Sequence, residues 1–419
     1  MASPVVLEVN PFADAFVVGD GEEEDEEPPK VLVSEHTNAN ALNPILQQQA
    51  IQLMLDLFPD HTAADVEISH IHSSPQSLTV NISIFPSSPS PSLPWYTLSS
   101  FLPCSPRHRK RAGSSRYTLR IPHTSSVRAL TYEVTTLSYL SHTLPYPIPK
   151  VVVYDSSTSN ALDKSYILYE RLPGRSLRST WASLNAAQRA SAARGIAGFI
   201  HDLGRLRSKC PGLVSVWNTV FDFKQDVVRV EEMPLSRSPT TTTGLPPLAA
   251  PMSTREFLLD LAKRQQASAV KMGIPAYEAI WTRIEGMIES LHSLGVIPDA
   301  EGFCLHHPNL TADNILIAVL DDRTVKITGF LSWDNALFGP KFLAMHVPQF
   351  MPSSGEGEAV VGVLAAFETV LGVEWCRMAN RPELELARKL WGVLLKGMVG
   401  SGDVFAAEEI LDEFEKVGA

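Results

Sequence analysis

Residues 306–314 read HHPNLTADN, and an apolar run, ILI at 315–317, follows at once. Three polar side chains in this stretch have a characteristic spacing, because Asn309 comes two residues after His307 and Asn314 comes five residues after Asn309. The apolar run is typical of a buried strand. The segments on either side must show whether this spacing marks a site or arises by chance.

The length and composition favour a folded protein with two lobes. A chain of 419 residues can bury a large core, and an apolar fraction of 44% is typical of globular proteins. With 46 acidic and 35 basic residues the net charge is −11, which argues against nucleic acid as a partner. Part of this charge lies in GEEEDEE at 21–27, so the rest of the chain is closer to neutral.

The cysteines and the apolar segments favour a soluble protein of the cytoplasm. The four cysteines lie far apart without a CxxC pair, which argues against a zinc site or a disulfide framework and favours a reducing compartment. No lysine precedes Lys30, so the basic segment of a secretory or mitochondrial presequence is missing. No apolar run reaches the roughly 18 residues that cross a bilayer, and we expect no membrane partner.

The first part of the chain predicts an acidic tail, then a small sheet with one main helix. Residues 1–40 are acidic and contain proline, which predicts a flexible tail. The apolar periodicity predicts strands at 77–85, at 116–122, and within 149–155 and 165–174, and helices at 43–59 and 129–140. An inserted loop, 86–115, carries RHRKR at 107–111. We interpret RHRKR as a solvated charge run, with a nuclear address or a phosphate patch as the alternatives.

The pattern becomes mainly helical after residue 174. Asn185 and Gln188 have the spacing of a capping box at the start of a helix. Apolar side chains repeat at helical spacing in two stretches, Ile196, Phe199, Ile200 and Leu203, and Ile280, Ile284, Met287, Ile288 and Leu291. Residues 315–334 read as a β-hairpin with the tight turn DDRT, and the chain beyond them is mostly helical.

Five segments in this order resemble the aminoglycoside phosphotransferase and choline kinase family. They are YTLRIP at 117–122, the helix with Glu133, YILYERLPGRSL at 166–177, the HxxLxxxNIL pattern from His307 to Leu316, and ITGFLSWDNALFGP at 327–340. The resemblance implies an α+β, two-lobed kinase-like fold. We expect a small N-terminal antiparallel-sheet lobe with one main helix at 41–173, and a larger, mainly helical C-terminal lobe at 174–419.

The resemblance also implies a nucleotide site for ATP in the cleft between the lobes. Arg120 is at the position where a strand cation of the family contacts the phosphates, and Glu133 on the next helix would pair with it. An ordinary salt bridge between a strand and a helix explains this pair equally well. The backbone from Glu170 to Leu172 would line the adenine.

Two acidic positions of the family's reaction are neutral in this chain. The family places a catalytic aspartate two residues after His307, where this chain has Asn309, whose carboxamide is not basic near pH 7. The family's metal-binding aspartate before the tryptophan is Ser332 here, which leaves Asn314 as one neutral ligand. Because Mg²⁺ prefers anionic oxygens, these residues argue against Mg²⁺. Asp334, two residues further on, is the candidate substitute ligand.

The expected phosphate cover is changed as well. The family has a turn with glycine between its first two strands, whereas residues 70–80 here have no glycine and have Pro75 at their centre. A proline removes one amide donor, and Cβ atoms hinder the close approach of a phosphate. Three altered features that serve one reaction, in an intact apolar frame, indicate a degraded phosphotransfer site.

Three functions remain open on this sequence. The first is a pseudokinase-type binding or regulatory protein that holds a nucleotide or small molecule in the cleft or presents a surface to a protein partner. The second is a weak or atypical ATP-dependent phosphotransferase for a small hydroxylated or amino-containing acceptor, working through Asp334 or Asp313. The third is an enzyme of another class that reuses the cleft, for which no motif is found.

Overall fold

A computed structural model describes ten stretches of the chain, 44–74, 76–86, 113–123, 127–215, 229–235, 247–274, 277–300, 302–346, 348 and 358–418. The described residues form two compact units. The small unit comprises those up to Leu130 together with 150–171, and the large unit comprises 131–149 and those from Leu172 on. The predictions for the tail 1–40, for Pro75 and for most of the loop 86–115, including RHRKR, lie outside the described residues.

The small unit contains a five-stranded antiparallel sheet with the strand order β1-β2-β3-β5-β4. Its strands are β1 (Val66–Ser73), β2 (Ser77–Ile84), β3 (Ser115–Pro122), β4 (Val151–Asp155) and β5 (Tyr166–Glu170). Before them come helix α1 (Pro44–Leu57) and the single 3-10 turn η2 (Ala63–Asp65). The strands predicted from alternation are therefore confirmed to within a few residues.

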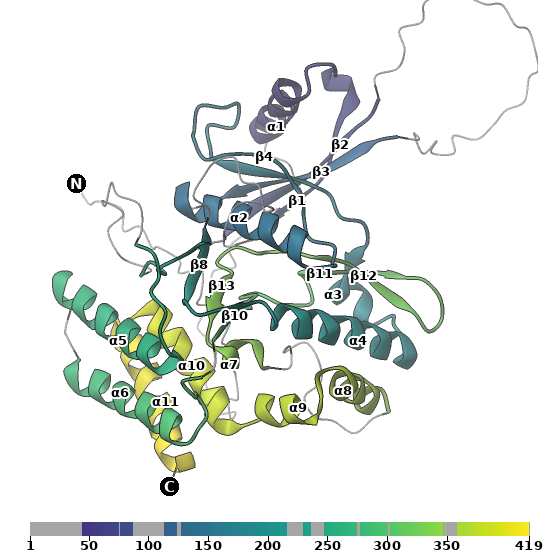
Figure 1. The fold of residues 1–419 in the computed structure, drawn as a ribbon. Helices are drawn as coiled ribbons and strands as arrows, with labels where there is room; N and C mark the ends of the chain where they lie inside the picture. The colour runs from purple at the N-terminus through teal and green to yellow at the C-terminus, as the bar shows by residue number, and fades with distance from the viewer. Residues whose placement is uncertain are drawn as a thin grey trace, which may run out of the picture. The chain divides into compact units, whose positions relative to one another are not determined.

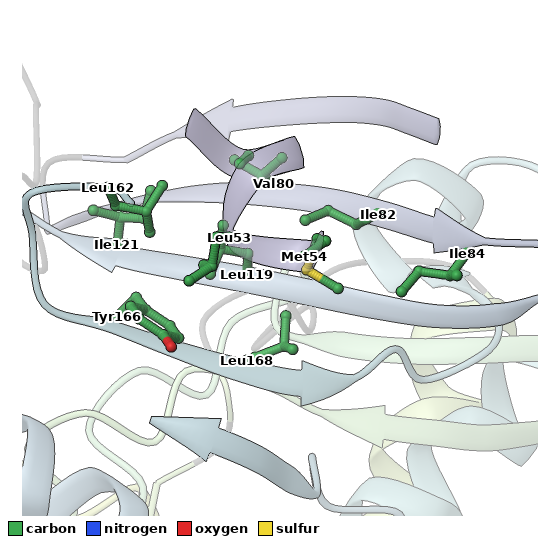
Figure 2. Close-up of a cluster of buried hydrophobic side chains, with 11 residues drawn as sticks. Leu53, Met54, Val80, Ile82, Ile84, Leu119, Ile121, Leu162, Tyr166 and Leu168 are labelled. Atoms are coloured by element: carbon green, nitrogen blue, oxygen red, sulfur yellow. The ribbon is translucent and has the colours of Figure 1, made fainter. Parts of the chain in front are cut away.

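Helix α1 covers one face of this sheet (Figure 2). Alternate residues of β2 point to the same face, and Val80, Ile82 and Ile84 are all buried there. Leu53 and Met54 of α1 pack against them, together with side chains from β3 and β5. The periodicity of 43–59 predicted this helix, and the apolar face of the sheet explains what the helix packs on.

The large unit combines helices with two small antiparallel sheets (Figure 1). Its helices are α2 (Val127–Thr143), which begins in the small unit, α3 (Leu177–Trp181), α4 (Ala186–Leu203), α5 (Thr254–Lys271), α6 (Glu278–Ser293), α7 (Lys341–Ala344), α8 (Glu358–Leu371), α9 (Val373–Ala379), α10 (Pro382–Lys396) and α11 (Ser401–Gly418). One sheet has the order β7-β10-β13-β8-β9, and the other has the order β12-β11-β6. Their strands are β6 (Arg175–Ser176), β7 (Arg207–Ser208), β8 (Gly212–Ser215), β9 (Arg229–Glu231), β10 (Phe303–His306), β11 (Ile315–Val319), β12 (Val325–Phe330) and β13 (Leu337–Gly339).

The capping box at the start of α4 also holds the hairpin of β11 and β12. The Asn185 side chain accepts from the Gln188 N–H, and the Gln188 side chain accepts from the Asn185 N–H, as predicted. The remaining amide protons of both side chains reach the hairpin turn, where they donate to the backbone oxygens of Asp322 (2.9 Å) and Asp321 (2.9 Å). The cap therefore fixes the turn that follows β11.

The mixed α+β fold with an N-terminal sheet lobe agrees with the prediction, but the large unit differs from it in two places. Its five-stranded sheet was not expected, because strands of two to four residues are too short to show a period. Helix α5 was also not identified, although Ser253 and Glu256 form its capping box. None of the helices in the described part of the chain is long and apolar enough to cross a membrane.

The packing of α1 gives a testable stability difference. Leu53 is 2% exposed, whereas Ile45 on the same helix is 66% exposed. We expect Leu53→Ala to lower the free energy of unfolding by about 2–5 kcal/mol, because it leaves a cavity, and Ile45→Ala to change it by less than about 0.5 kcal/mol. Urea unfolding followed by circular dichroism measures both. Equal effects would contradict the packing of α1 on the sheet.

Candidate active site

The loop 307–314 joins β10 to β11 and is closed by its own backbone. The oxygen of Asn309 accepts from the Thr311 N–H at 2.9 Å, and the oxygen of Thr311 accepts from the Asn314 N–H at 3.1 Å. The Asn314 side chain adds a bond from Nδ2 to the Asn309 oxygen at 2.9 Å. Helix α3 holds the loop from outside, because the Arg178 N–H donates to the Ala312 oxygen at 3.0 Å. Asn309 and Asn314 are therefore linked directly.

His307 connects this loop to the end of β12. Its imidazole is 3% exposed, and Nδ1 accepts from the Asn309 N–H at 3.1 Å. Since Nδ1 accepts, the proton is on Nε2, which donates to the Leu331 oxygen at 2.9 Å. Burial lowers the pKa of His307 to about 4, against the smaller opposing effects of the Leu331 bond and the charge of Asp334. The ring is neutral near pH 7 and serves as a crosslink.

Ser332 lies beside Asn314, so the structure brings the metal-site positions together. The Leu331 N–H donates to the Asn314 backbone oxygen at 2.8 Å, and the Ser332 hydroxyl donates to Asn314 Oδ1 at 2.9 Å. Both ends of the Asn314 amide are thus used inside the protein. Ser332 has a φ of 61°, in the left-handed region, which Asn and Asp adopt more readily than most other residues.

An aromatic cluster packs against the hydrogen-bonded network that the loop 307–314 forms with Leu331 and Ser332. Trp333 is 1% exposed, donates from Nε1 to the Phe330 oxygen at 2.9 Å, and lies edge-on to the His307 ring at 4.4 Å between centroids. Phe199 of α4 stacks on Phe330 at 3.6 Å and meets Trp333 edge-on at 6.0 Å. These contacts hold both ends of residues 330–333 by aromatic packing and one hydrogen bond, without any charged group.

The two candidate substitute carboxylates have different surroundings. Asp313 accepts from Arg178 Nε at 2.6 Å, and both side chains are more than half exposed. Asp334 is partly exposed, and its charge acts on the His307 imidazole, so it lies near the network. In the part of the chain that the structure describes, no group of three or more His, Cys, Asp or Glu side chains is placed to hold a metal ion.

The predicted phosphate contacts lie in the small unit. Arg120 of β3 donates from Nε to Ser77 Oγ at 3.2 Å, at the end of the turn between β1 and β2. In that turn the Ser74 N–H donates to the Ser77 oxygen (2.9 Å), and the Ser77 N–H donates to Ser74 Oγ (3.1 Å). These two amides are already bonded within the turn, so neither is available to a phosphate. Glu133 is 4% exposed on α2 in the large unit, and its pairing with Arg120 stays a prediction.

The backbone expected to line the adenine is also partly occupied. The Glu170 N–H donates to the Lys150 oxygen at 2.9 Å, and the Arg171 N–H donates to the Arg116 oxygen at 2.9 Å. Leu172 begins the next segment of the large unit, and its side chain packs against Gly329 at the end of β12. The amides of Glu170 and Arg171 are thus used in the small sheet.

Two contacts of this site were not found from the sequence. Leu331 acts through its backbone, and a backbone group has no side-chain signature. Arg178 holds the loop through both its N–H and its guanidinium, and its spacing of 135 residues from Asp313 gives no local pattern. The order of His307, Asn309 and Asn314 was the detectable signal.

Three comparisons with known proteins give matches. A family model described as the phosphotransferase enzyme family matches residues 106–342 of the 419. Subtelomeric hrmA-associated cluster proteins from two strains of Aspergillus fumigatus are 25% and 24% identical over 269 residues, and each alignment covers 52% of both chains. The chain therefore spans about half the length of these curated relatives.

Similar solved structures include two aminoglycoside phosphotransferases, neither of which is close in sequence. One, solved with GDP and kanamycin, has a TM-score of 0.46 and 14% identity, with 89% of this chain and 99% of that chain covered. The other, a thermostable mutant solved with AMP-PNP and hygromycin B, has a TM-score of 0.44 and 12% identity, with 88% and 97% covered.

Two further histidines in the large unit have lowered pKa values. His306 ends β10, and burial followed by the positive charges of His346 and His307 lowers its pKa to about 3. His346 follows α7, and burial followed by the charge of Arg388 lowers its pKa to about 4. Arg388 itself donates to the Met345 oxygen at 3.1 Å. The large unit therefore holds one buried and two partly buried imidazoles whose pKa values lie below the ordinary value.

These imidazoles predict a loss of stability in mild acid. The ordinary histidine pKa is 6.5, and that of folded His307 is about 4, so between these values the unfolded chain binds a proton that the folded chain does not. The contribution of His307 to the free energy of unfolding is therefore fully present above pH 6.5 and decreases as the pH is lowered toward 4. Urea unfolding between pH 4.5 and 6.5 should show this slope, and His307→Gln should reduce it by up to about 1.4 kcal/mol per pH unit.

The matched control is His142→Gln, because His142 is exposed near the end of α2. We expect it to leave the slope unchanged. A slope that is the same in wild type and His307→Gln would show that His307 is not held neutral by the fold.

Proposed function

Because this chain belongs to the phosphotransferase enzyme family, we propose that it is a pseudokinase-type binding or regulatory protein with a disabled phosphotransfer site. One observation carries the proposal, namely that neutral hydrogen bonds through Asn314 link Asn309 and Ser332, the two positions where the family's reaction needs a carboxylate. The geometry of the site is kept, and its charge is not. Fold membership alone does not establish activity, because function depends on such positions.

The first support for this proposal is the neutral residue at position 309, where the family has its catalytic base. A carboxylate at 309 would orient and accept the proton of an acceptor hydroxyl, whereas the Asn309 carboxamide is neutral. Losing a general base typically lowers a rate by about 10²–10⁴-fold. The neighbouring His307 does not replace it, because both of its ring nitrogens are already bonded to backbone groups.

The second support for the proposal is the arrangement of Ser332 and Asn314, where the family binds its metal ion. The Ser332 hydroxyl proton points at Asn314 Oδ1, the oxygen that would have to face a cation. The other end of that amide donates to the Asn309 oxygen. A Mg²⁺ ion would therefore meet a neutral oxygen with a proton directed at it and no anionic ligand at 332, so Mg²⁺ does not fit this arrangement.

The nucleotide contacts limit what could be held. Arg120 supplies a cation near the turn of β1 and β2, but the Ser74 and Ser77 amides of that turn are bonded internally. We therefore propose as the ligand a nucleotide or another small molecule held in the family's interlobe cleft without Mg²⁺, and a protein partner as the second form of a regulatory role. Among the described residues, Cys210, Cys304 and Cys376 carry thiols that are not joined in disulfides, which supports the proposed cytoplasmic location.

The second candidate function is a weak ATP-dependent phosphotransferase acting on a small hydroxylated or amino-containing acceptor. The observation that favours it is the action of the Asp334 charge on His307, which places a carboxylate near the network. Asp313 is the weaker substitute, because it already pairs with Arg178. In this alternative Asp334 would supply the missing negative charge.

Restoring charge tests the proposal. The left-handed backbone at Ser332 suits aspartate, and Asn309 is held in its loop by backbone groups, so Asn309→Asp with Ser332→Asp should fold. We expect the double variant to gain Mg²⁺-dependent ATP hydrolysis at least about 10-fold above wild type, and each single variant to gain little, because the two groups act as a unit.

The matched control pairs Asn309→Asp with Ser332→Asn, which has the shape of aspartate without its charge. It should behave like wild type. The opposite result is Mg²⁺-dependent phosphotransfer by the wild-type protein that is abolished by Asp334→Asn. That outcome would establish the enzyme alternative.

A further inference from the structure

Helix α2 contains residues of both units. Its first residues, up to Leu130, belong to the small unit, and 131–143 belong to the large unit. The helix also carries Glu133, the position that the family's pairing with Arg120 would use. What fixes this helix to the large unit therefore decides where Glu133 is held.

The structure provides one strong polar contact for this purpose. The Tyr132 hydroxyl donates to Glu231 Oε2 of β9 at 2.6 Å. The Ser215 hydroxyl, at the end of β8, donates to Glu231 Oε1 at 2.6 Å. Hydrogen bonds to a carboxylate are shorter and stronger than neutral ones, and here both oxygens of Glu231 take part.

The backbone of Glu231 is paired on both sides. Glu231 pairs with Leu213 of β8 on one side and forms a bridge with Leu248 on the other. Gly212, with a φ of 138°, lets β8 come so close to β9 that a Cβ there would overlap the backbone oxygen of Glu231. Because Glu231 is held by two neighbouring segments, its carboxylate is a fixed point against which α2 is positioned.

We propose that Tyr132, Ser215 and Glu231 form an α2 latch, a conformational device that holds α2 on β9 and thereby sets the position of Glu133. Successive residues of a helix are about 100° apart around its axis, so any shift that frees Tyr132 also moves Glu133. This inference goes beyond the proposed function, because the latch acts on α2 whether or not the site binds a nucleotide.

Hydrogen–deuterium exchange of the full chain tests the latch. Tyr132→Phe removes the donor hydroxyl and keeps the ring, so we expect amides of 131–143 to exchange at least about 10-fold faster. Amides of α4 should exchange at the wild-type rate, because α4 takes no part in the contact. Tyr154→Phe on β4 is the matched control, since it removes a tyrosine hydroxyl from the small sheet.

A second variant, Glu231→Gln, keeps the side chain's shape and removes its charge. It should also speed up the hydrogen exchange of amides 131–143, by a smaller factor than Tyr132→Phe does. Unchanged exchange of 131–143 in both variants would overturn the proposal. Equal acceleration in α4 and α2 would overturn it as well, because the contact would then stabilise the large unit as a whole and would not act as a latch on one helix.

Discussion

The backbone of Leu331 is the point on which the site depends, because the loop 307–314 binds both of its polar groups. Its N–H donates to the Asn314 oxygen, and its carbonyl accepts from His307 Nε2. These two bonds join the loop to the end of β12 and so determine where the next residue lies. Ser332 then takes a left-handed conformation that directs its hydroxyl to the Asn314 side chain. The whole site follows from this junction.

None of the interactions that build the junction needs a carboxylate at 309 or 332. The imidazole of His307 is neutral, and the other donors and acceptors are amides, carbonyls, the Ser332 hydroxyl and the Trp333 indole, all of them uncharged. Trp333 and Phe330 pack on Phe199. Removing the two charges therefore leaves the fold intact, since the frame is stabilised by burial and by satisfied backbone groups. A chain of this family can in this way keep its fold without carboxylates at positions 309 and 332.

Sequence reasoning succeeded where a local pattern reports a local structure. The apolar pattern identified β2 to β5 of the small sheet but not β1, and Asn185 and Gln188 identified the start of α4. The loop-and-hairpin order placed Asn309, Asn314 and Ser332 in segments that the structure joins. It failed where the structure depends on contacts without a period. The strands of the five-stranded sheet in the large unit are too short to alternate, and the 99 residues between Tyr132 and Glu231 leave no local signal. The backbone roles at Leu331 and in the turn of β1 and β2 could not be read from side chains at all.

The most direct test of the proposed neutral site is the thermal stability of the wild-type protein with ATP, in excess Mg²⁺ and in EDTA. A ligand of the folded state stabilises it by RT ln(1 + [L]/Kd), so any binding is visible once the ligand well exceeds its Kd. With neutral side chains at 309, 314 and 332, we predict that the shift produced by ATP is the same in Mg²⁺ and in EDTA. A shift that appears only with Mg²⁺ would contradict the account, because it would require an anionic metal ligand at this site.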